Sequence, residues 1–311
     1  MATLTSEEKE PPLQIGYWKI RGLAAALRMT CTYAGAEYES VEYVSKPKEG
    51  GGYDTSEWHA QKRELATKNA LINLPYVLDG ETLVTQSNAC LYYLGRKFRL
   101  AGVTALEQMR VDEALCQVMD LRNETVRAPR APPLAFAHPR IPPPLTHDLP
   151  RAQVGLVYGK LRRVPRESAL DLGAGTHLAG SVQIHYMKLE GYMQSNDTRF
   201  LCADHPTVAD FHMCAGKMAD EHERLLPPAL ASPRPHAICR DLRWEMIDQH
   251  ERMARWLGVK SPLTGHGCLA ALYNKLRTEP KLAPYFASEQ YALPQNSPMA
   301  GYGGTIDDGR E

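Results

Sequence analysis

The fold of this chain is decided by a short segment near its start, Ile15-Gly16-Tyr17-Trp18-Lys19-Ile20-Arg21-Gly22-Leu23-Ala24. An apolar, strand-like run stops at Tyr17 and Trp18, a glycine follows, and a helix-forming stretch extends from Leu23 to Ala34. This pattern predicts a turn from strand to helix with a phenol at its mouth. Such a turn exposes a side chain and nearby backbone N–H groups to a ligand. A phenol hydroxyl held there can donate a hydrogen bond to an anion, and a thiolate is stabilised near neutral pH in this way.

Two later segments contain related signals. One is the loop, proline-headed strand and turn Asn73-Leu74-Pro75-Tyr76-Val77-Leu78-Asp79-Gly80. The other is the polar helix start Thr85-Gln86-Ser87-Asn88-Ala89. Together the three segments resemble the glutathione-binding half of the cytosolic glutathione S-transferases, and most closely the mu class. The resemblance covers about residues 13–126, and it returns in pieces over about 154–213 and from 244 to the end.

Length and charge limit the classes of function. The chain has 311 residues, enough for two modest domains, and 43% hydrophobic with 23% charged residues is ordinary for a globular protein. Basic and acidic residues balance at 36 each, which argues against nucleic acid or an anionic membrane as the main partner. No run approaches the length of about 18 apolar residues that a membrane span needs. The polar, acidic start at 1–12 lacks the apolar core of a secretory signal.

Cysteine and histidine patterns predict neither disulfides nor a metal site. The seven cysteines are scattered, odd in number and without a C-x-x-C spacing, which indicates buried or free thiols in a reducing compartment. Two His-Glu pairs, at His222 and His250, lack the second histidine of the H-E-x-x-H pattern of zinc proteases. We therefore expect a cytoplasmic protein without a metal, and the resemblance implies glutathione as a co-substrate with no cofactor.

Hydrophobic periodicity and turn residues predict an α/β arrangement in the first third of the chain. We expect strands at 13–19, 39–44, 75–79 and 82–85, and helices at 23–34, 57–68 and 87–98. The order βαβ, then α, then ββα is that of a thioredoxin-like domain. Pro75 cannot donate to a strand ladder and therefore belongs at the start of its strand. The resemblance implies a cis peptide bond before it.

From residue 106 onward the pattern changes to helices. We expect them at 106–126, 176–195, 207 onward, 244–257 and 267–277. Thr207 and Asp210 have the spacing of a capping box, which opens a helix. The expected fold class is an α/β thioredoxin-like N-terminal domain followed by an all-α C-terminal domain, the glutathione transferase fold. Its expected boundaries are 1–98 for the first domain, 106–295 for the second, and 296–311 for a C-terminal tail.

Two proline-rich segments, 127–153 and 214–243, interrupt the resemblance, and loops of this length are unusual inside a compact domain. Without the second segment the chain would run from Met213 into Trp244 and match the family's core helix. Uncut, the pattern also allows a helix that continues past Phe211. A genuine insertion, a short duplication and an unspliced stretch in a gene model all stay open for this segment.

The resemblance implies that the Tyr17 hydroxyl donates to the sulfur of bound glutathione. A free thiol with a pKa of about 8.5 is only a few per cent thiolate at pH 7. Lowering that pKa by about two units requires about 2.7 kcal/mol of preferential stabilisation of the anion. One charge-assisted hydrogen bond together with N–H groups at a helix N-terminus can supply this amount. By local pattern alone, a tyrosine at a strand end is also consistent with a half-buried aromatic residue.

The resemblance assigns further residues to glutathione. They are Trp18, Trp58 and Lys62 at its glycine end, Asn73, Leu74 and Pro75 at its cysteinyl backbone, and Gln86 and Ser87 at its γ-glutamyl carboxylate. Trp58 and Lys62 share one predicted helix face, where an indole N–H and an ammonium can donate to a carboxylate. By local pattern alone, Trp58 is a half-exposed residue of a surface helix, and Ser87 or Asn88 is a helix N-cap.

Four more positions bear on a partner subunit or on the ligands. Asp120 matches an acidic residue that reaches the glutathione amine from the neighbouring subunit, which implies a C₂ homodimer. Leu71 stands where the mu class has the aromatic residue that locks its dimer. Thr55 stands where the family has a basic residue for the glycine carboxylate. Tyr158 is the candidate for the pocket that binds the electrophile.

The function that the resemblance implies is conjugation of glutathione thiolate to small hydrophobic electrophiles, in detoxification. The alternative is a non-catalytic glutathione-binding relative whose electrophile pocket is disrupted by the two inserts. A glycine-rich run from Leu170 to His177 also resembles the loop of S-adenosylmethionine-dependent methyltransferases. That reading is disfavoured because no buried strand precedes the run, and His177 stands where a glycine is expected.

Overall fold

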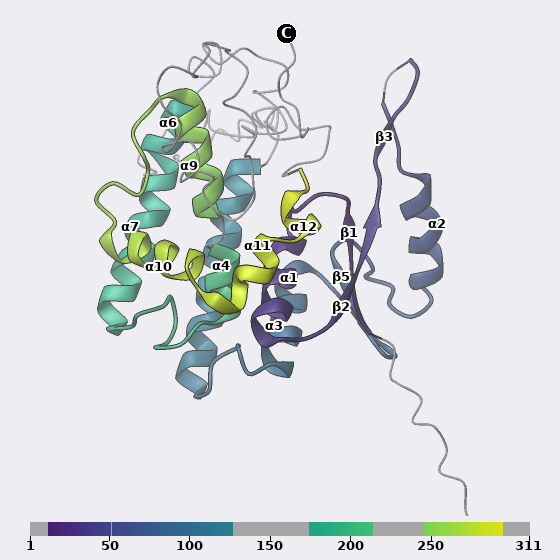
Figure 1. Ribbon diagram of the computed structural model, residues 1–311, viewed down its shortest axis with the longest axis horizontal. Coiled ribbons are helices and arrows are strands. Elements are labelled where there is room, and N and C mark those ends of the chain that lie inside the picture. Colours follow the sequence, from purple (N-terminus) through teal and green to yellow (C-terminus); the bar gives the residue numbers. More distant parts are fainter. Residues whose placement is uncertain (1–11, 51, 127–173, 214–245, 295–311) are drawn as a thin grey trace, which may run out of the picture.

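The computed structural model describes residues 12–50, 52–126, 174–213 and 246–294. Figure 1 shows a sheet that has helix α2 (Ser56–Leu65) on one side and helices α1 (Ala24–Ala34) and α3 (Ser87–Lys97) on the other. A bundle of further helices lies beyond α1 and α3. The proline-rich segments 127–153 and 214–243 and the expected tail at 296–311 lie outside the described residues.

The main sheet has four strands in the order β2-β1-β5-β6. They are β1 (Leu13–Trp18), β2 (Tyr38–Tyr43), β5 (Tyr76–Asp79) and β6 (Thr82–Thr85), each within one residue of its predicted bounds. Strand β1 is parallel to β2, with Tyr17 opposite Glu42, and antiparallel to β5, with Gly16 opposite Tyr76. Glycine is required at position 16, because a Cβ there would lie 2.0 Å from the Tyr76 ring.

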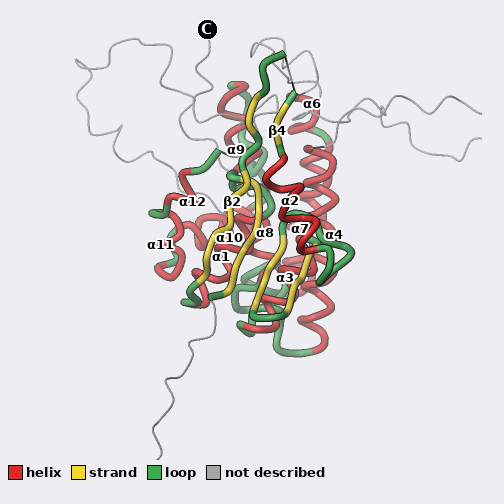
Figure 2. Tube along the Cα trace, turned by 90° about the vertical axis from the view of Figure 1, so that its right-hand side faces the viewer, coloured by secondary structure: helices red, strands yellow, loops and turns green. Residues whose placement is uncertain are grey.

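Figure 2 views the sheet from the α2 side, with the strands side by side. A second, antiparallel pair of strands, β3 (Lys46–Pro47) and β4 (Tyr53–Asp54), leads into α2. The sequence did not predict this pair, because strands of two residues are too short to show an alternating pattern. Helix α2 ends at Leu65 instead of continuing to residue 68. The Thr67 hydroxyl donates to the carbonyl oxygen of Glu64 at 2.7 Å, which favours a turn there.

The remaining part of the structure is helical. Its main helices are α4 (Ala105–Val126), α6 (Ala174–Ala179), α7 (Ser181–Asn196), α8 (Val208–Met213), α9 (Met246–Leu257) and α10 (Gly267–Arg277). The single helix predicted at 176–195 is divided into α6 and α7 at Gly180, whose backbone is not helical (φ −113°, ψ −87°). The capping box of α8 is confirmed, because the Asp210 carboxylate accepts hydrogen bonds from the backbone N–H and the hydroxyl of Thr207, at 2.7 and 2.8 Å.

A buried polar network joins the ends of three of these helices. The Thr125 hydroxyl, near the end of α4, donates to the carbonyl oxygen of Leu121 at 2.9 Å. It also lies 3.2 Å from Nε2 of His177 on α6 and 3.1 Å from Nε2 of His250 on α9. Because the hydroxyl has only one hydrogen, both imidazoles must donate to its oxygen. Nδ1 of His250 then accepts from the Tyr186 hydroxyl at 3.0 Å.

The end of the described chain returns to the α/β part. A 3₁₀ turn η4 (Pro280–Leu282) and the short helix α11 (Ala283–Phe286) lie against α1. A second short helix, α12 (Glu289–Ala292), packs on α11 and lies near the turn between β1 and α1 (Figure 1). One continuous hydrophobic core therefore includes β1, α1, the helical bundle and this C-terminal segment. Within the part of the chain that the structure describes, no helix has the length and apolar character needed to cross a membrane.

Candidate functional site

Tyr17 is the next-to-last residue of β1, and its ring packs against Gly22 in the turn that leads to α1. Gly22 has a φ of +38°, and a Cβ there would lie 2.4 Å from the Tyr17 ring and 2.8 Å from its hydroxyl oxygen. Only glycine therefore fits beneath the phenol. Tyr17 is 6% exposed, which is less than the sequence predicts, because the turn covers one side of the ring.

The turn beneath Tyr17 is held by neighbouring elements. Lys19 donates its backbone N–H to the carbonyl oxygen of Tyr43 at 2.7 Å, which extends the pairing of β1 with β2. The guanidinium of Arg28 on α1 donates to the carbonyl oxygen of Ile20 at 3.1 Å. Arg28 is fully buried, and burial lowers the pKa of its guanidinium, although Glu42 on β2 opposes this effect. The sequence analysis missed Arg28, although an arginine within an apolar helix segment is the signal that could have identified it.

Trp18, Trp58 and Lys62 come together on the α2 side of the sheet. The Trp18 and Trp58 rings meet edge to face with centroids 6.5 Å apart, and Nζ of Lys62 lies 5.9 Å from the Trp58 ring centroid. Trp58 is only 4% exposed and packs against Tyr43 and Tyr76. The reading of Trp58 as a half-exposed residue of a surface helix is therefore wrong.

The cap of α2 comes from Asp54, whose carboxylate accepts from the backbone N–H of Ser56 at 2.9 Å. This hydrogen bond lowers the pKa of the Asp54 carboxyl. Thr55 is the next residue, and its hydroxyl lies 3.2 Å from Nδ1 of His59. The family pattern has a basic residue at the position of Thr55. In this chain the exposed imidazole of His59, one helical turn into α2, lies beside that position.

The loop from Asn73 to Pro75 is held by a residue that the sequence analysis did not single out. The peptide bond between Leu74 and Pro75 is cis, as expected. The hydroxyl of Thr85 donates to the carbonyl oxygen of Asn73 at 2.8 Å and accepts from its backbone N–H at 3.0 Å. Thr85 is buried and ends β6, so the loop and the start of α3 are fixed to one another.

Gln86 and Ser87 follow Thr85 directly and form the start of α3. Gln86 has a φ of +73°, a backbone conformation that residues other than glycine seldom adopt. Ser87 is the first residue of this 11-residue helix, so its backbone N–H lies at the positive end of the helix dipole. The site thus combines an uncommon backbone conformation with a helix N-terminus, an arrangement suited to binding a carboxylate.

Comparisons with known proteins identify the fold. Residues 13–96 match the family described as "Glutathione S-transferase, N-terminal domain". The chain is similar to the solved "gluthatione S-transferase Blo t 8", with a TM-score of 0.58 and 18% identity over 93% of this chain and 99% of that one. It is also similar to the structure of NaGST-2, with a TM-score of 0.54 and 19% identity over 89% and 97% of the two chains. The fold is that of a glutathione S-transferase.

Sequence relatives indicate the class within this fold. The chain is 41% identical to "Glutathione S-transferase Mu 4" of Mus musculus over 121 residues, 39% of this chain and 54% of the relative. It is 38% identical to "Glutathione S-transferase Mu 3" of Homo sapiens over 143 residues, 45% of this chain and 59% of the relative. The chain thus spans little more than half the length of these curated relatives, and the similarity is to mu-class members.

Two of the predicted residues are exposed, and a third lies outside the described residues. Asp120 is exposed on α4, and Leu71 is 73% exposed between α2 and β5. Tyr158 lies outside the described residues. Of the glycine-rich run, only residues 174–177 are described; they open α6, and His177 is buried in the network around Thr125.

A small hollow lies between the two parts of the fold, next to the turn that supports Tyr17. It has a volume of about 20 Å³ and is lined by Gly22, Leu23, Ala25, Ala26, Arg122, His212 and Met246. His212 is buried; this burial, together with the charge of Arg122, lowers its pKa to about 3, so its imidazole is neutral at physiological pH. A hollow of this size admits one water molecule.

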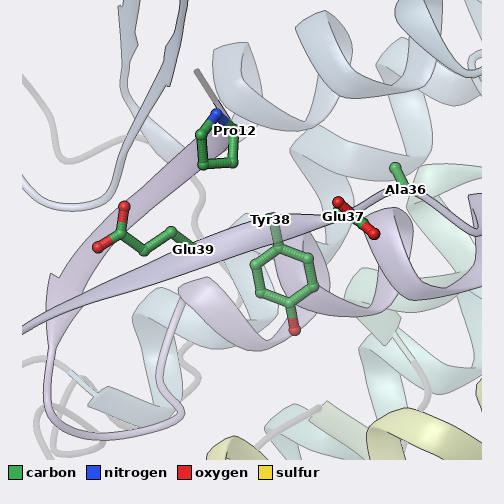
Figure 3. Close-up of a pocket in the computed structure, with 5 residues that line it drawn as sticks. All are labelled: Pro12, Ala36, Glu37, Tyr38 and Glu39. Carbon is green, nitrogen blue, oxygen red and sulfur yellow. The ribbon is translucent and has the colours of Figure 1, made fainter. Parts of the chain in front are cut away.

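A shallower pocket lies at the other end of the strands. Figure 3 shows the residues that line it, Pro12, Ala36, Glu37, Tyr38 and Glu39. Tyr38 pairs with Leu13 at the start of the parallel strands, whereas Tyr17 pairs with Glu42 near their ends. This pocket is therefore distinct from the site around Tyr17.

Proposed function

We propose that this chain binds glutathione and catalyses the attack of its thiolate on small hydrophobic electrophiles. The observation that supports this most directly is the position of Tyr17. Its phenol stands near the end of β1, at the same end of the sheet as the Asn73 loop and the start of α3, because Gly16 pairs with Tyr76 and Tyr76 pairs with Thr85. Trp18, whose ring meets that of Trp58, follows Tyr17 directly. These groups correspond to the sulfur, the glycine carboxylate, the cysteinyl backbone and the γ-glutamyl carboxylate of one extended tripeptide.

In this proposal the charges of glutathione meet groups of the opposite sign. Lys62 and the indole N–H of Trp18 or Trp58 bind the glycine carboxylate. Ser87 and the N-terminal N–H groups of α3 bind the γ-glutamyl carboxylate. The backbone of Leu74 pairs with the cysteinyl residue and sets the distance of its sulfur from Tyr17. A tripeptide held at three points leaves its thiol little freedom, which favours reaction.

The chemistry proposed for Tyr17 is stabilisation of the thiolate. The thiol of glutathione loses its proton to solvent, and the Tyr17 O–H donates a hydrogen bond to the sulfur anion that forms. The sulfur lone pair then forms a carbon–sulfur bond with the electrophile. In one route the electrophilic carbon releases a leaving group, which takes the bonding electrons with it. In the other, the electrons of a bond at that carbon move to an oxygen atom, which then takes up a proton. Neither route needs a redox change or a cofactor.

We also propose a C₂ homodimer in a reducing, cytoplasmic setting, acting in detoxification. Leu71 supports the dimer as an exposed apolar side chain, and Asp120 as an exposed carboxylate on α4 that could reach the partner's glutathione. The cysteines in the described ranges are free thiols, in keeping with a reducing compartment. Sedimentation of the full chain tests the dimer: Leu71→Glu should shift it toward the monomer.

The test of the proposed activity uses the purified full chain with glutathione and an aryl halide. Formation of the thioether conjugate above the uncatalysed rate supports the proposal. Glutathione binding measured by calorimetry, without any conjugate formed, is the result expected of a non-catalytic relative and would contradict catalysis. Failure to bind glutathione at millimolar concentration would overturn the whole assignment.

A further inference from the structure

The C-terminal segment contacts the turn that supports Tyr17, although about 270 residues separate them in sequence. The backbone N–H of Arg21 donates to the carbonyl oxygen of Pro294 at 2.9 Å. The guanidinium carbon of Arg21 lies 4.4 Å from the centroid of the Tyr291 ring. Arg21 is fully buried and Tyr291 is 2% exposed. A cation over an aromatic face is attracted most strongly when both groups are removed from water, as they are here.

The Tyr291 ring is itself fixed by its neighbours. Its centroid lies 5.4 Å from that of Tyr285 and 5.2 Å from that of Phe286, in near-perpendicular arrangements. The backbone N–H of Tyr291 donates to the Ser288 hydroxyl at 3.2 Å, and that hydroxyl donates to the carbonyl oxygen of Tyr285 at 2.7 Å. Tyr291 is therefore a rigid platform, anchored in the core through α11 and α12, and not the mobile end of a tail.

The contact with Arg21 extends to the phenol of Tyr17. Arg21 directly precedes Gly22, and the Gly22 backbone lies so close to the Tyr17 ring that no side chain fits between them. The carbonyl oxygen of Ile20, on the other side of Arg21, is fixed by Arg28. The turn is thus held from α1 through Arg28 and from the C-terminal segment through Arg21.

We propose that Tyr291 is a positioning residue for the thiolate site, acting through Arg21 on the turn that supports Tyr17. The inference rests on the proposed role of Tyr17 in stabilising the glutathione thiolate. Tyr291 itself touches neither the phenol nor the sulfur. Its effect is to hold the Tyr17 hydroxyl at the correct distance from the sulfur, and a displacement of a fraction of an ångström weakens such a hydrogen bond.

The test compares Tyr291→Leu, which removes the ring, with Tyr291→Phe, which keeps it, in the full chain. Tyr291→Leu should raise the pKa of bound glutathione thiol and lower kcat/KM about 10-fold at pH 6.5, with a smaller loss at pH 8.5. Glutathione affinity should stay within about 3-fold, because the tripeptide contacts are made elsewhere. Tyr291→Phe should have the pH profile of the wild type.

A structural role alone would lower the unfolding midpoint of Tyr291→Leu without changing the pH profile of the folded enzyme. A folded Tyr291→Leu variant with a wild-type pH profile therefore overturns the proposal. A second measurement, amide hydrogen exchange of the unmodified chain, applies even if the leucine variant does not fold. The amides of Arg21 and Tyr291 should exchange in the same opening event, and independent exchange would show that the link is absent.

The exchange experiment also separates this inference from the proposed function. If the wild-type chain forms no conjugate, the proposed role of Tyr17 is wrong. The coupling of the Arg21 amide to the C-terminal helices would still be seen or refuted by exchange alone.

Discussion

The Thr85 hydroxyl and the Asn73 backbone form a two-way pair, in which Thr85 donates to the carbonyl oxygen at 2.8 Å and accepts from the N–H at 3.0 Å. Asn73 opens the loop that precedes the cis peptide bond, and Thr85 directly precedes Gln86. One buried hydroxyl therefore fixes the spacing between the two segments that we assign to the cysteinyl and γ-glutamyl parts of glutathione.

Replacing Thr85 tests this spacing. Thr85→Val removes both hydrogen bonds and leaves two backbone groups unsatisfied, so the free energy of unfolding should fall by about 2 kcal/mol. The dissociation constant of glutathione should rise, because the loop and the start of α3 lose their fixed separation. Thr85→Ser keeps the hydroxyl and should be close to wild type in both measurements. Unchanged glutathione affinity in a folded Thr85→Val variant, measured by calorimetry, would contradict the argument.

Tyr17→Phe removes the hydroxyl and keeps the ring that packs on Gly22. We expect kcat/KM at pH 6.5 to fall by about 10- to 100-fold, the loss typical of one donor to an anion. The pKa of the bound thiol should rise, while glutathione affinity should change only a few-fold because the other contacts remain. Tyr38→Phe makes the same change at the other end of the sheet and should leave both values unchanged. Full activity of Tyr17→Phe at pH 6.5 would exclude Tyr17 as the donor.

Gln86 combines an unfavourable backbone conformation with a proposed role in binding. Gln86→Gly should raise the free energy of unfolding by about 0.5–1 kcal/mol, because glycine adopts the positive φ without strain. The same change should weaken glutathione binding by removing the side-chain amide. Arg99 also has a positive φ (+60°) and is exposed at the end of α3, so Arg99→Gly serves as a control. Arg99→Gly should stabilise the protein without affecting glutathione binding. A loss of stability in Gln86→Gly would show that the positive φ of Gln86 is not a source of strain.

The network around Thr125 predicts a dependence of stability on pH. Burial lowers the pKa of His177 from 6.5 to about 4 and that of His250 well below 6.5, so both are neutral in the fold. At a pH between the pKa of these histidines in the fold and 6.5, the unfolded chain binds more protons than the folded chain. The contribution of the two neutral histidines to the free energy of unfolding is therefore complete above pH 6.5 and is lost as the pH falls toward 4. Asp210 acts in the opposite direction, because burial raises the pKa of its carboxyl to about 6.

A variant isolates the contribution of His177 to the pH dependence of stability. His177→Gln keeps an N–H donor for Thr125 but cannot titrate, so the fall in stability between pH 7.5 and 5 should be smaller by about 2 kcal/mol than in the wild type. Denaturant unfolding at the two pH values measures this difference. His59→Gln makes the same substitution at an exposed position on α2 and is the matched control. An equal pH dependence in His177→Gln and the wild type would show that His177 is not the titrating group.

The features that the sequence predicted well are those with a local cause. Periodicity or spacings of three or four residues account for the strand that has Tyr17 near its end, the capping box of Thr207 and Asp210, and the position of Ser87. The boundary at Gly180 was missed, because a glycine within a helical pattern is often tolerated.

The features that the sequence could not provide depend on which distant residues meet. Thr85 is an ordinary strand residue until the Asn73 loop folds against it, and Arg28 is understood only once the Ile20 carbonyl lies beside it. The burial of Trp58 on helix α2 likewise follows from its contacts with Tyr43 and Tyr76, which lie on strands β2 and β5. Local pattern indicated an exposed position because the residues around Trp58 in α2 are polar.

The shared hydroxyl of Thr125 has a consequence for how this chain tolerates change. Thr125 lies at the end of α4, His177 in the last turn of α6 and His250 in the first half of α9, so one oxygen atom joins three helices that are far apart in sequence. Because closure entropy grows only with the logarithm of loop length, joining points this far apart costs little more free energy than joining nearer ones. A substitution at Thr125 is therefore expected to disturb three helices at once, through partners 52 and 125 residues away in the chain.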